Sequence, residues 1–278
     1  MHDAISRTYL FVPATRTDRV AKALATGADA VIVDLEDAVP PSGKAAARDA
    51  AARDLPGAGP VFIRINGPES DWFEEDLKLC AVLGVRGVVL PKAERPDHVR
   101  HASDRLNPGT VILPLIETAR GFAGLAALCE TEQVQRVVFG SIDFQFDLGI
   151  TGEGEELLLF RSGLVLASRV AGIQSPVDGV TVEIDDALRV RDDALRARRL
   201  GFGGKLCIHP KQVAPVNECF RPSADETAWA RRIVEAAQAA NGAAVALDGK
   251  MVDRPVILKA EEILREADFY ALPAHHPV

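Results

Sequence analysis

Residues 111–121 read Val-Ile-Leu-Pro-Leu-Ile-Glu-Thr-Ala-Arg-Gly, a short apolar run that ends abruptly in polar residues. Short apolar runs rich in β-branched residues are typical of strands buried on both faces, as the strands of a parallel sheet are. The stretch Gly121–Glu130 that follows is a helix candidate. This segment therefore predicts one unit of a strand–helix repeat, with Glu117 at the carboxyl end of its strand.

The same unit recurs on both sides of this segment. Eight repeats in 278 residues predict an α/β fold, a closed (β/α)8 or TIM barrel. The alternative is an open doubly wound sheet, but the turn after the first strand reads Pro-Ala-Thr-Arg at 13–16, where that fold has a glycine-rich phosphate loop. The strands are predicted at Thr8–Val12, Ala30–Asp34, Val61–Ile65, Gly87–Leu90, Val111–Ile116, Arg136–Phe139, Asp178–Val182 and Lys205–Ile208, and the helix candidates include Asp18–Ala25, Lys44–Arg53, Asp71–Leu83 and Asp97–Leu106.

We expect two parts along the chain. Residues 1–212 form the TIM-barrel catalytic domain, and residues 213–278 form a C-terminal helical extension. The extension holds two helical patterns, Asp225–Asn241 and Arg254–Asp268, separated by the glycine-rich connector Gly242–Met251. Because this tail exceeds what a barrel needs to close, it predicts a lid, or an arm that packs on a neighbouring subunit.

The overall composition excludes several classes of partner. A net charge of -8 and a pI near 5.3 lack the basic character that nucleic-acid binding requires. No stretch is apolar and long enough to span a bilayer, and the first residues lack the pattern of a signal peptide. The four cysteines are widely spaced, as buried reduced thiols are (Cys80, Cys129, Cys207 and Cys219). We therefore expect a soluble, cytoplasmic protein that binds neither nucleic acid nor a membrane.

Two carboxylates follow adjacent predicted strands, Glu117 and Asp143. In a (β/α)8 barrel the carboxyl ends of the strands converge on the face where catalysis occurs. A single carboxylate there is more often a helix cap or a surface charge, but two within apolar runs would be costly to bury without a cation. Mg²⁺ suits carboxylate and water ligands, whereas zinc would favour the histidine and thiolate of His209 and Cys207, which lie on another strand. The pair therefore predicts a magnesium site.

Arg64 lies one residue before the end of the third predicted strand, and its alternation with apolar neighbours points its side chain into the barrel mouth. It either forms a structural ion pair with Asp34 or Glu36, or donates hydrogen bonds to a substrate carboxylate or enolate, and the two roles can coexist. Asp34, Glu36 and Asp37 are interpreted as supports for Arg64 and for the lysine at position 44. Lys92 allows a Schiff-base mechanism, which is the less favoured reading beside the two carboxylates.

Six motifs in this order resemble the citrate lyase beta-subunit-like branch of the HpcH/HpaI aldolase superfamily, from Tyr9 to about Ala267. They are Leu35-Glu36-Asp37-Ala38-Val39, Arg64-Ile65-Asn66, Leu90-Pro91-Lys92, Ile116-Glu117-Thr118-Ala119-Arg120-Gly121, Gly140-Ser141-Ile142-Asp143-Phe144 and Cys207-Ile208-His209-Pro210-Lys211-Gln212. The resemblance implies a TIM barrel that acts on acyl-CoA thioesters with Mg²⁺.

The resemblance also implies roles for particular residues. Glu117 and Asp143 would hold the metal, and Arg64 and Glu117 would contact the substrate. Positions 11–22 and 29 resemble the edge that binds CoA, with Lys22 as a phosphate contact and Asp29 beside it, and Ile208 and His209 would lie at a substrate-contacting strand end.

Asp253 matches the remaining catalytic position of the family, within Gly249-Lys250-Met251-Val252-Asp253-Arg254-Pro255. In relatives an aspartate in such a run lies on a C-terminal arm, reaches the site of a neighbouring subunit and acts as acid or base. The same position is also that of a helix N-cap, and the two uses are compatible.

The expected function is therefore Mg²⁺-dependent cleavage of a β-hydroxyacyl-CoA, of the citramalyl-CoA or malyl-CoA type, to acetyl-CoA and a 2-oxo acid. The alternatives are a class II 2-oxo-acid aldolase that needs no CoA, a citryl-thioester lyase beta subunit of a multi-chain citrate lyase, and a non-catalytic CoA-binding regulator. We expect a homo-oligomer, a trimer or a hexamer.

Overall fold

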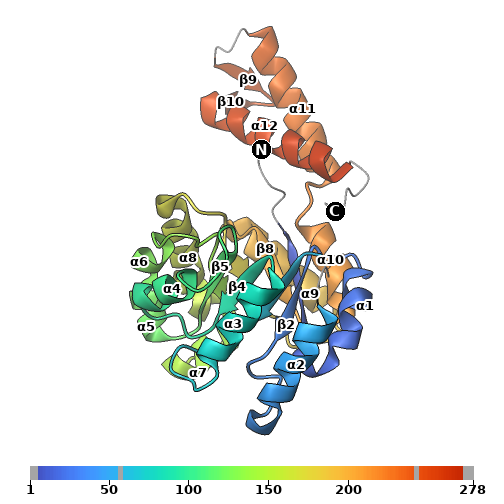
Figure 1. The fold of residues 1–278 in the computed structure, drawn as a ribbon. Helices are drawn as coiled ribbons and strands as arrows, with labels where there is room; N and C mark the ends of the chain where they lie inside the picture. Colours follow the sequence, from blue (N-terminus) through green and yellow to red (C-terminus); the bar gives the residue numbers. More distant parts are fainter. Residues whose placement is uncertain (1–5, 56–58, 241–243, 272–278) are drawn as a thin grey trace. The chain divides into compact units, whose positions relative to one another are not determined.

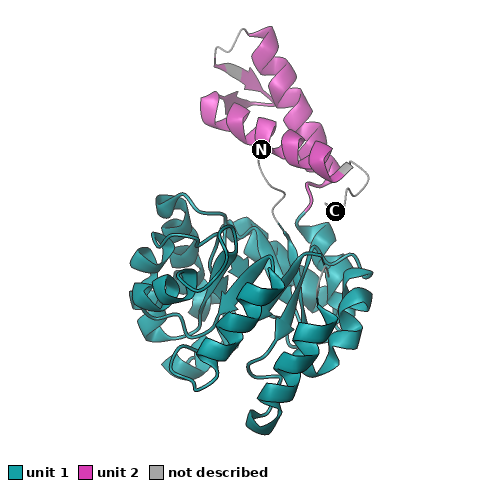
Figure 2. Cartoon of the chain, viewed as in Figure 1, with its two compact units in different colours: residues 1–220 teal, residues 221–278 magenta. Residues whose placement is uncertain are grey.

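The computed structural model describes residues 6–55, 59–240 and 244–271. The chain divides into two compact units, residues 1–220 and residues 221–278 (Figure 2). The division falls later than the predicted boundary after residue 212, because the helix α10 (Val213–Cys219) packs against α9 (Ala187–Leu200) and β1 (Thr8–Pro13) of the first unit. The two units are described separately below.

The first unit is the predicted barrel. Eight parallel strands pair in chain order, and β1 closes the sheet by pairing with β8 (Figure 1). The strands after β1 are β2 (Ala30–Asp34), β3 (Val61–Arg64), β4 (Gly87–Leu90), β5 (Val111–Ile116), β6 (Val138–Phe139), β7 (Val177–Asp178) and β8 (Gly204–Cys207). All eight overlap the predicted strands. β6 and β7 are shorter than predicted because their mutual pairing is confined to Val138 and Val177.

Helices surround the strands. They comprise α1 (Val20–Leu24), α2 (Lys44–Asp54), α3 (Phe73–Leu83), α4 (Pro96–Ser103), α5 (Ala119–Ala123), α6 (Leu125–Cys129), α7 (Ser141–Leu148), α8 (Leu158–Ala171), α9 and α10, with short 3-10 helices at Ala14–Arg19, Pro41–Gly43, Glu155–Leu157 and Pro210–Gln212. The helix predicted at Gly121–Glu130 is instead split at Gly124, where a β-carbon would lie 2.8 Å from the carbonyl oxygen of Glu94.

Side-chain direction alternates along each strand and sorts the residues into two cores. Leu113 and Leu115 belong to the core inside the barrel, whereas Ile112 and Ile116 pack outward against the helices. The same alternation gives Glu117 the inward direction of Leu115, and Arg64 the inward direction of Phe62. The strand pattern thus explains why charged residues lie at the inner mouth of the barrel.

The four cysteines are buried, as predicted. Burial raises the pKa of each thiol, to about 11 for Cys129 and to about 12 for Cys207. Each thiol therefore remains protonated and unreactive at neutral pH.

The second unit is a pair of helices with a hairpin between them. It contains α11 (Ala224–Ala239), β9 (Val245–Leu247), β10 (Lys250–Val252) and α12 (Arg254–Ala271). The small core of this unit consists of Ala230, Ile233, Val252, Ala260 and Ile263.

The hairpin corrects the prediction of a connector at 242–251, of which residues 242 and 243 lie outside the described part. Asp248 and Gly249, which join the two strands, both have positive φ, 52° and 72°, as a two-residue hairpin turn requires. Across the described ranges, every helix is too short or too polar to cross a bilayer.

Candidate active site at the carboxyl ends of the barrel strands

A cavity of about 440 Å³ opens at the carboxyl ends of the barrel strands. Its size is within the range of small-molecule sites. Carboxylates and one guanidinium lie among its lining, and the remaining lining is mainly apolar. The lining residues are Phe11, Pro13, Asp34, Asp37, Ala38, Arg64, Leu115, Glu117, Phe139, Gly140, Ser141, Ile142, Asp143, Val180, Leu206 and Ile208.

Glu117 is the buried carboxylate of this site, with 2% of its surface exposed. Its Oε1 accepts a hydrogen bond of 2.8 Å from the backbone N–H of Lys92. Its side chain lies against Gly140, where a β-carbon would come within 2.6 Å of Glu117 Cβ and 2.8 Å of Oε2. Burial, with the negative charge of Glu36 as a second cause, raises the pKa of Glu117 to about 8. The hydrogen bond and the positive charge of Lys92 lower the pKa of Glu117 but do not offset these two causes.

Asp143 lies in the first turn of α7, is exposed, and lines the same cavity as Glu117. Its charge contributes to the raised pKa of Glu117, so the two carboxylates are close enough to interact. The prediction that both are buried among apolar residues is correct for Glu117 and wrong for Asp143. Asp143 is exposed because it belongs to the helix α7, which follows the buried strand β6.

The donor set fits Mg²⁺. One buried and one exposed carboxylate on a cavity provide oxygen ligands and leave positions for water and substrate, which this ion prefers. The described residues contain no group of three histidine, cysteine or acidic side chains that could enclose a metal. Cys207 is buried, and His209 Nδ1 accepts the backbone N–H of Lys211 at the start of a 3-10 helix. These contacts do not favour zinc.

Arg64 lines the cavity and is held by carboxylates at the end of β2 and in the loop that follows this strand. Its Nε and Nη2 donate to the two oxygens of Asp34 at 2.8 and 2.7 Å, and Nη1 lies 3.2 Å from Glu36 and 3.1 Å from Asp37. The guanidinium also lies over the ring of Phe11, 5.1 Å from its centre. Burial alone would lower the pKa of Arg64, but these three carboxylates raise it overall. The expected support of Arg64 by Asp34, Glu36 and Asp37 is thus present.

Two lysines accompany this acidic cluster. Lys92 Nζ donates to Glu36 Oε1 at 2.6 Å. Burial opposes its charge, but Glu36 raises the pKa of Lys92 overall, so this amine stays protonated and is a poor Schiff-base nucleophile. Lys44 Nζ donates to the backbone carbonyls of Leu35 and Glu36, at 2.7 Å each, rather than to the carboxylates predicted as its partners.

The other predicted site residues are dispersed. Ile208 lines the cavity, whereas His209 is occupied as a helix cap. Lys22 is exposed on α1. Asp29 precedes β2, at the amino-terminal end of the barrel, and its carboxylate accepts 2.8 Å hydrogen bonds from Arg7 Nε and Nη2. The structure therefore does not bring Asp29 to the cavity, and we exclude it from the proposed site.

Asp253 belongs to the second unit, where it begins α12. Its carbonyl accepts the backbone N–H of Ile257 at 3.0 Å, and its Oδ1 lies 3.5 Å from the N–H of Val256. The helix-cap reading of this residue is present in the structure. Its catalytic role stays a prediction.

Sequence reasoning missed the apolar wall of the cavity and Gly140. The sequence identified four of the lining residues only as parts of strands: Leu115, Phe139, Val180 and Leu206. For Leu115 and Leu206, the inward direction along the strand could have predicted a place in the cavity lining. Gly140 would have been recognisable only from the closeness of Glu117.

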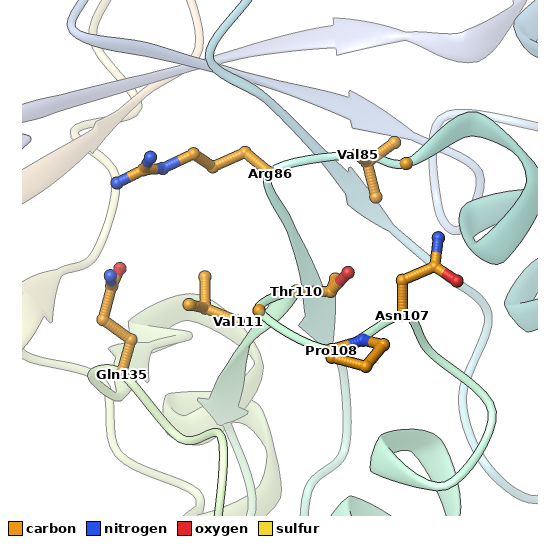
Figure 3. A pocket seen from close by; sticks show the side chains of 9 residues that line it. Val85, Arg86, Asn107, Pro108, Thr110, Val111 and Gln135 are labelled. Atoms are coloured by element: carbon orange, nitrogen blue, oxygen red, sulfur yellow. The ribbon is translucent and has the colours of Figure 1, made fainter.

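A second cavity lies at the amino-terminal ends of β4 and β5 (Figure 3). Its polar side chains are Arg86, Asn107, Thr110 and Gln135, and the described residues that line it include no carboxylate, histidine or cysteine. It lacks the groups for metal or acid–base chemistry. The candidate active site is therefore the cavity at the opposite mouth of the barrel.

Comparisons with known proteins agree with this assignment. The profile of the HpcH/HpaI aldolase/citrate lyase family matches residues 7–210, and that of a carbon–carbon bond lyase of the TIM-barrel fold matches residues 175–272. A citrate lyase subunit beta-like protein of Deinococcus radiodurans is 39% identical, over 94% of this chain and 97% of its own. The mitochondrial citramalyl-CoA lyase of Rattus norvegicus is 29% identical, over 93% and 85%.

A solved structure is also similar along nearly the whole chain. It is the protein CitE of Mycobacterium tuberculosis in complex with magnesium, acetoacetate and coenzyme A, with a TM-score of 0.86 and 34% identity over 95% of this chain and 99% of that one. The same protein has been solved with magnesium and pyruvate, at a TM-score of 0.76.

Proposed function

This chain belongs to the HpcH/HpaI aldolase/citrate lyase family, and we propose that it is a carbon–carbon lyase that uses Mg²⁺ to cleave a β-hydroxyacyl-CoA to acetyl-CoA and a 2-oxo acid. The observation that carries the proposal is the pair Glu117 and Asp143 on one cavity, with a raised pKa at the buried member. Citramalyl-CoA and malyl-CoA are the substrate types, and the reaction is reversible.

In this proposal the residues have three roles: they bind the metal, accept the hydroxyl proton and stabilise the enolate. Glu117 and Asp143 would hold the metal, and Mg²⁺ bound there would supply Lewis acidity that favours loss of the substrate hydroxyl proton. Asp253 accepts that proton. The bond between the hydroxyl carbon and the acyl α-carbon breaks, and its electron pair stays on the acyl fragment as a thioester enolate. Arg64 stabilises the enolate oxygen, and a proton returned to the α-carbon completes acetyl-CoA.

The position of Arg64 supports its role. Two of its N–H groups bind Asp34 and fix the plane of the guanidinium, and the group still lines the cavity. A guanidinium has five N–H donors, and Asp34, Glu36 and Asp37 engage at most four of them, so at least one donor remains for a substrate oxygen. The surrounding carboxylates keep it charged throughout the reaction.

The test is a thioester panel with purified protein, with Mg²⁺ and after chelation. We expect cleavage of citramalyl-CoA or malyl-CoA in Mg²⁺, loss of cleavage in EDTA, and recovery when Mg²⁺ is returned. Glu117→Ala and Asp143→Ala should abolish turnover while circular dichroism shows a folded barrel. Full activity in EDTA would exclude the metal role.

The same panel separates the alternatives. Equal activity on free hydroxy-oxo acids would favour a class II aldolase. Dependence on added lyase subunits would favour the beta subunit of a multi-chain citrate lyase, whose counterpart in Leuconostoc mesenteroides is 27% identical. Tight acyl-CoA binding without turnover would favour a regulator.

We also propose a cytoplasmic homo-oligomer, a trimer or a hexamer, in which the C-terminal unit acts as an arm or lid. The exposed apolar face of α8 supports an association between subunits. Leu159, Leu166 and Val170 repeat on one side of this helix and are 72%, 66% and 76% exposed. Light scattering with size-exclusion chromatography measures the subunit number.

A further inference from the structure

Lys92 combines a disfavoured backbone conformation with contacts to two carboxylates near the cavity. It follows β4 and has a φ of 48°, in the left-handed region that residues with a β-carbon rarely adopt. Among the described residues other than glycine, only Gln133 and Asp248 share a positive φ, and Asp248 belongs to the hairpin turn. Because such a conformation is strained, the contacts around Lys92 must hold it in place.

The first contact is made by the backbone of Lys92. Its N–H donates to Glu117 Oε1 at 2.8 Å, which is the one hydrogen bond that the described residues give to this carboxylate. The chain that follows is tied to β5, because the N–H of Ala93 donates to the carbonyl of Leu115 at 3.4 Å. Since φ is the rotation about the N–Cα bond, a different φ at Lys92 would turn its N–H away from Glu117.

The second contact is made by the side chain of Lys92. Nζ donates to Glu36 Oε1 at 2.6 Å, and Glu36 Oε2 lies 3.2 Å from Arg64 Nη1. The side chain of Glu36 is buried, whereas that of Lys92 is half exposed. Lys92 therefore connects Glu117, the buried carboxylate of the cavity, with Arg64, the cation of the cavity.

The side chain explains why a lysine is suited to this position. A glycine would adopt the same φ without strain and would present the same N–H, so what lysine adds is the ammonium group. Without the ammonium, both oxygens of Glu36 could bind Arg64, whose Nη1 already lies 3.1 Å from Asp37. Fewer N–H groups of Arg64 would then remain for a substrate oxygen.

We propose that Lys92 is a positioning residue with two separable functions: its left-handed backbone holds Glu117 for Mg²⁺, and its ammonium keeps Glu36 from occupying Arg64. The inference rests on the proposed function and adds a residue that acts through Glu117 and Arg64. Mg²⁺ affinity then depends on whether the residue at position 92 tolerates a positive φ. Turnover in saturating Mg²⁺ depends on whether that residue carries a positive charge.

Calorimetric titration of the full-length protein with Mg²⁺ tests the backbone function. Lys92→Asn and Lys92→Val both remove the charge, but asparagine tolerates a left-handed backbone and β-branched valine does not. We expect Lys92→Val to bind Mg²⁺ roughly 10-fold or more weakly than Lys92→Asn, because Glu117 loses the group that orients it. Lys92→Ala, which has a smaller backbone penalty, takes the place of Lys92→Val if the latter does not fold.

Gln133→Val is the matched control for backbone strain. Gln133 has a φ of 65° and precedes β6, at the amino-terminal end of the barrel. Valine there meets a similar backbone penalty away from the metal carboxylates, so Mg²⁺ affinity should equal that of the wild type. An equal loss of affinity in Gln133→Val would attribute the effect to general destabilisation and overturn the function of Lys92.

Turnover of the best-cleaved thioester in saturating Mg²⁺ tests the ammonium. We expect kcat to fall roughly 10-fold or more in Lys92→Asn and to stay within about 3-fold of the wild type in Lys92→Arg, which keeps a cation beside Glu36. A residue needed only for folding would lower Mg²⁺ affinity and kcat together, whereas here the two quantities rank the variants differently.

Equal Mg²⁺ affinities of Lys92→Asn and Lys92→Val overturn the backbone function. Wild-type kcat in Lys92→Asn, or an equal loss of kcat in Lys92→Arg, overturns the function of the ammonium. If the wild-type protein cleaves no thioester, the proposed lyase function fails, and a weaker affinity of Lys92→Val still supports the positioning of Glu117. Circular dichroism of each variant separates these results from misfolding.

Discussion

At the scale of single residues, the surroundings of Glu117 oppose the negative charge of its carboxylate. Its carboxylate is buried, and its pKa in the fold is raised from 4.5 to about 8. The folded state therefore disfavours the charged form relative to the unfolded chain. The metal-free protein loses stability as pH rises from 4.5 through about 8.

Glu117→Gln should stabilise the metal-free protein although it abolishes catalysis. At pH 8 in EDTA we expect the free energy of unfolding to rise on the order of 1–3 kcal/mol, since the variant removes an unneutralised buried charge. Chemical denaturation measures the change. Glu155→Gln, at an exposed position, is the matched control and should have no effect. A less stable Glu117→Gln variant at pH 8 contradicts the role given to burial.

The same carboxylate sets the pH dependence of magnesium binding. Below about pH 8 a proton must leave Glu117 before the metal binds, so affinity should rise about tenfold for each pH unit and level off above pH 8. Calorimetric titration with Mg²⁺ at pH 6, 7, 8 and 9 gives the slope. An affinity that does not change between pH 6 and 8 would show that the pKa of Glu117 is not raised into this range.

At the scale of elements, the turn from β6 into α7 packs closely against the residue that follows β5, because Gly140 lies against the side chain of Glu117. Gly140→Ala introduces a β-carbon 2.6 Å from Glu117 Cβ and 2.8 Å from Oε2, so the carboxylate must move. We expect magnesium affinity to fall roughly 10-fold or more while the barrel stays folded. Gly43→Ala is the control, because its β-carbon would meet its neighbours at 3.5 Å and its φ is -97°. Equal affinity in both variants would remove Gly140 from the site.

The periodicity of apolar residues predicted the barrel strands best, because burial of their side chains determines where these strands lie in the sequence. All eight strands were found, and alternation correctly directed Arg64 into the barrel mouth. Asp143 was assigned correctly to the end of strand six but not to the surface, since the first turn of a helix lies outside strand alternation. The hairpin was missed because Asp248-Gly249 was interpreted as part of a loop, although both residues tolerate the positive φ that such a turn needs.

At the scale of the whole molecule, the predicted TIM barrel is confirmed, and the two compact units divide after residue 220, where the sequence predicted a domain boundary after residue 212. α10 was assigned to the extension because it follows the last strand, but it packs on the barrel. Asp29 was assigned to the CoA edge by resemblance, yet it precedes its strand in sequence. In a parallel barrel that order alone places it at the end opposite the active site.

A subunit complementation experiment tests whether Asp253 acts on the barrel of another chain. Neither Asp253→Asn nor Glu117→Gln should turn over substrate alone. Coexpressed in equal amounts, they should recover about a quarter of wild-type activity if each site combines the barrel of one chain with the arm of another. No recovery from verified mixed oligomers would mean that the arm serves its own barrel. Mixing Glu117→Gln with Asp143→Asn is the control and should recover nothing, because both changes lie in the barrel.

Because all four cysteines are buried, the native protein has no thiol among them that reacts readily with labelling reagents. Thiol-directed spin labels and fluorophores need an accessible thiolate, and Cys80, Cys129, Cys207 and Cys219 offer none at neutral pH. A cysteine engineered at exposed Met251 and another at exposed Val82 would react with such labels in the native protein. Dipolar spectroscopy or energy transfer between the two labels then tests whether the distance between the C-terminal unit and the barrel changes during turnover, with the natural thiols left in place.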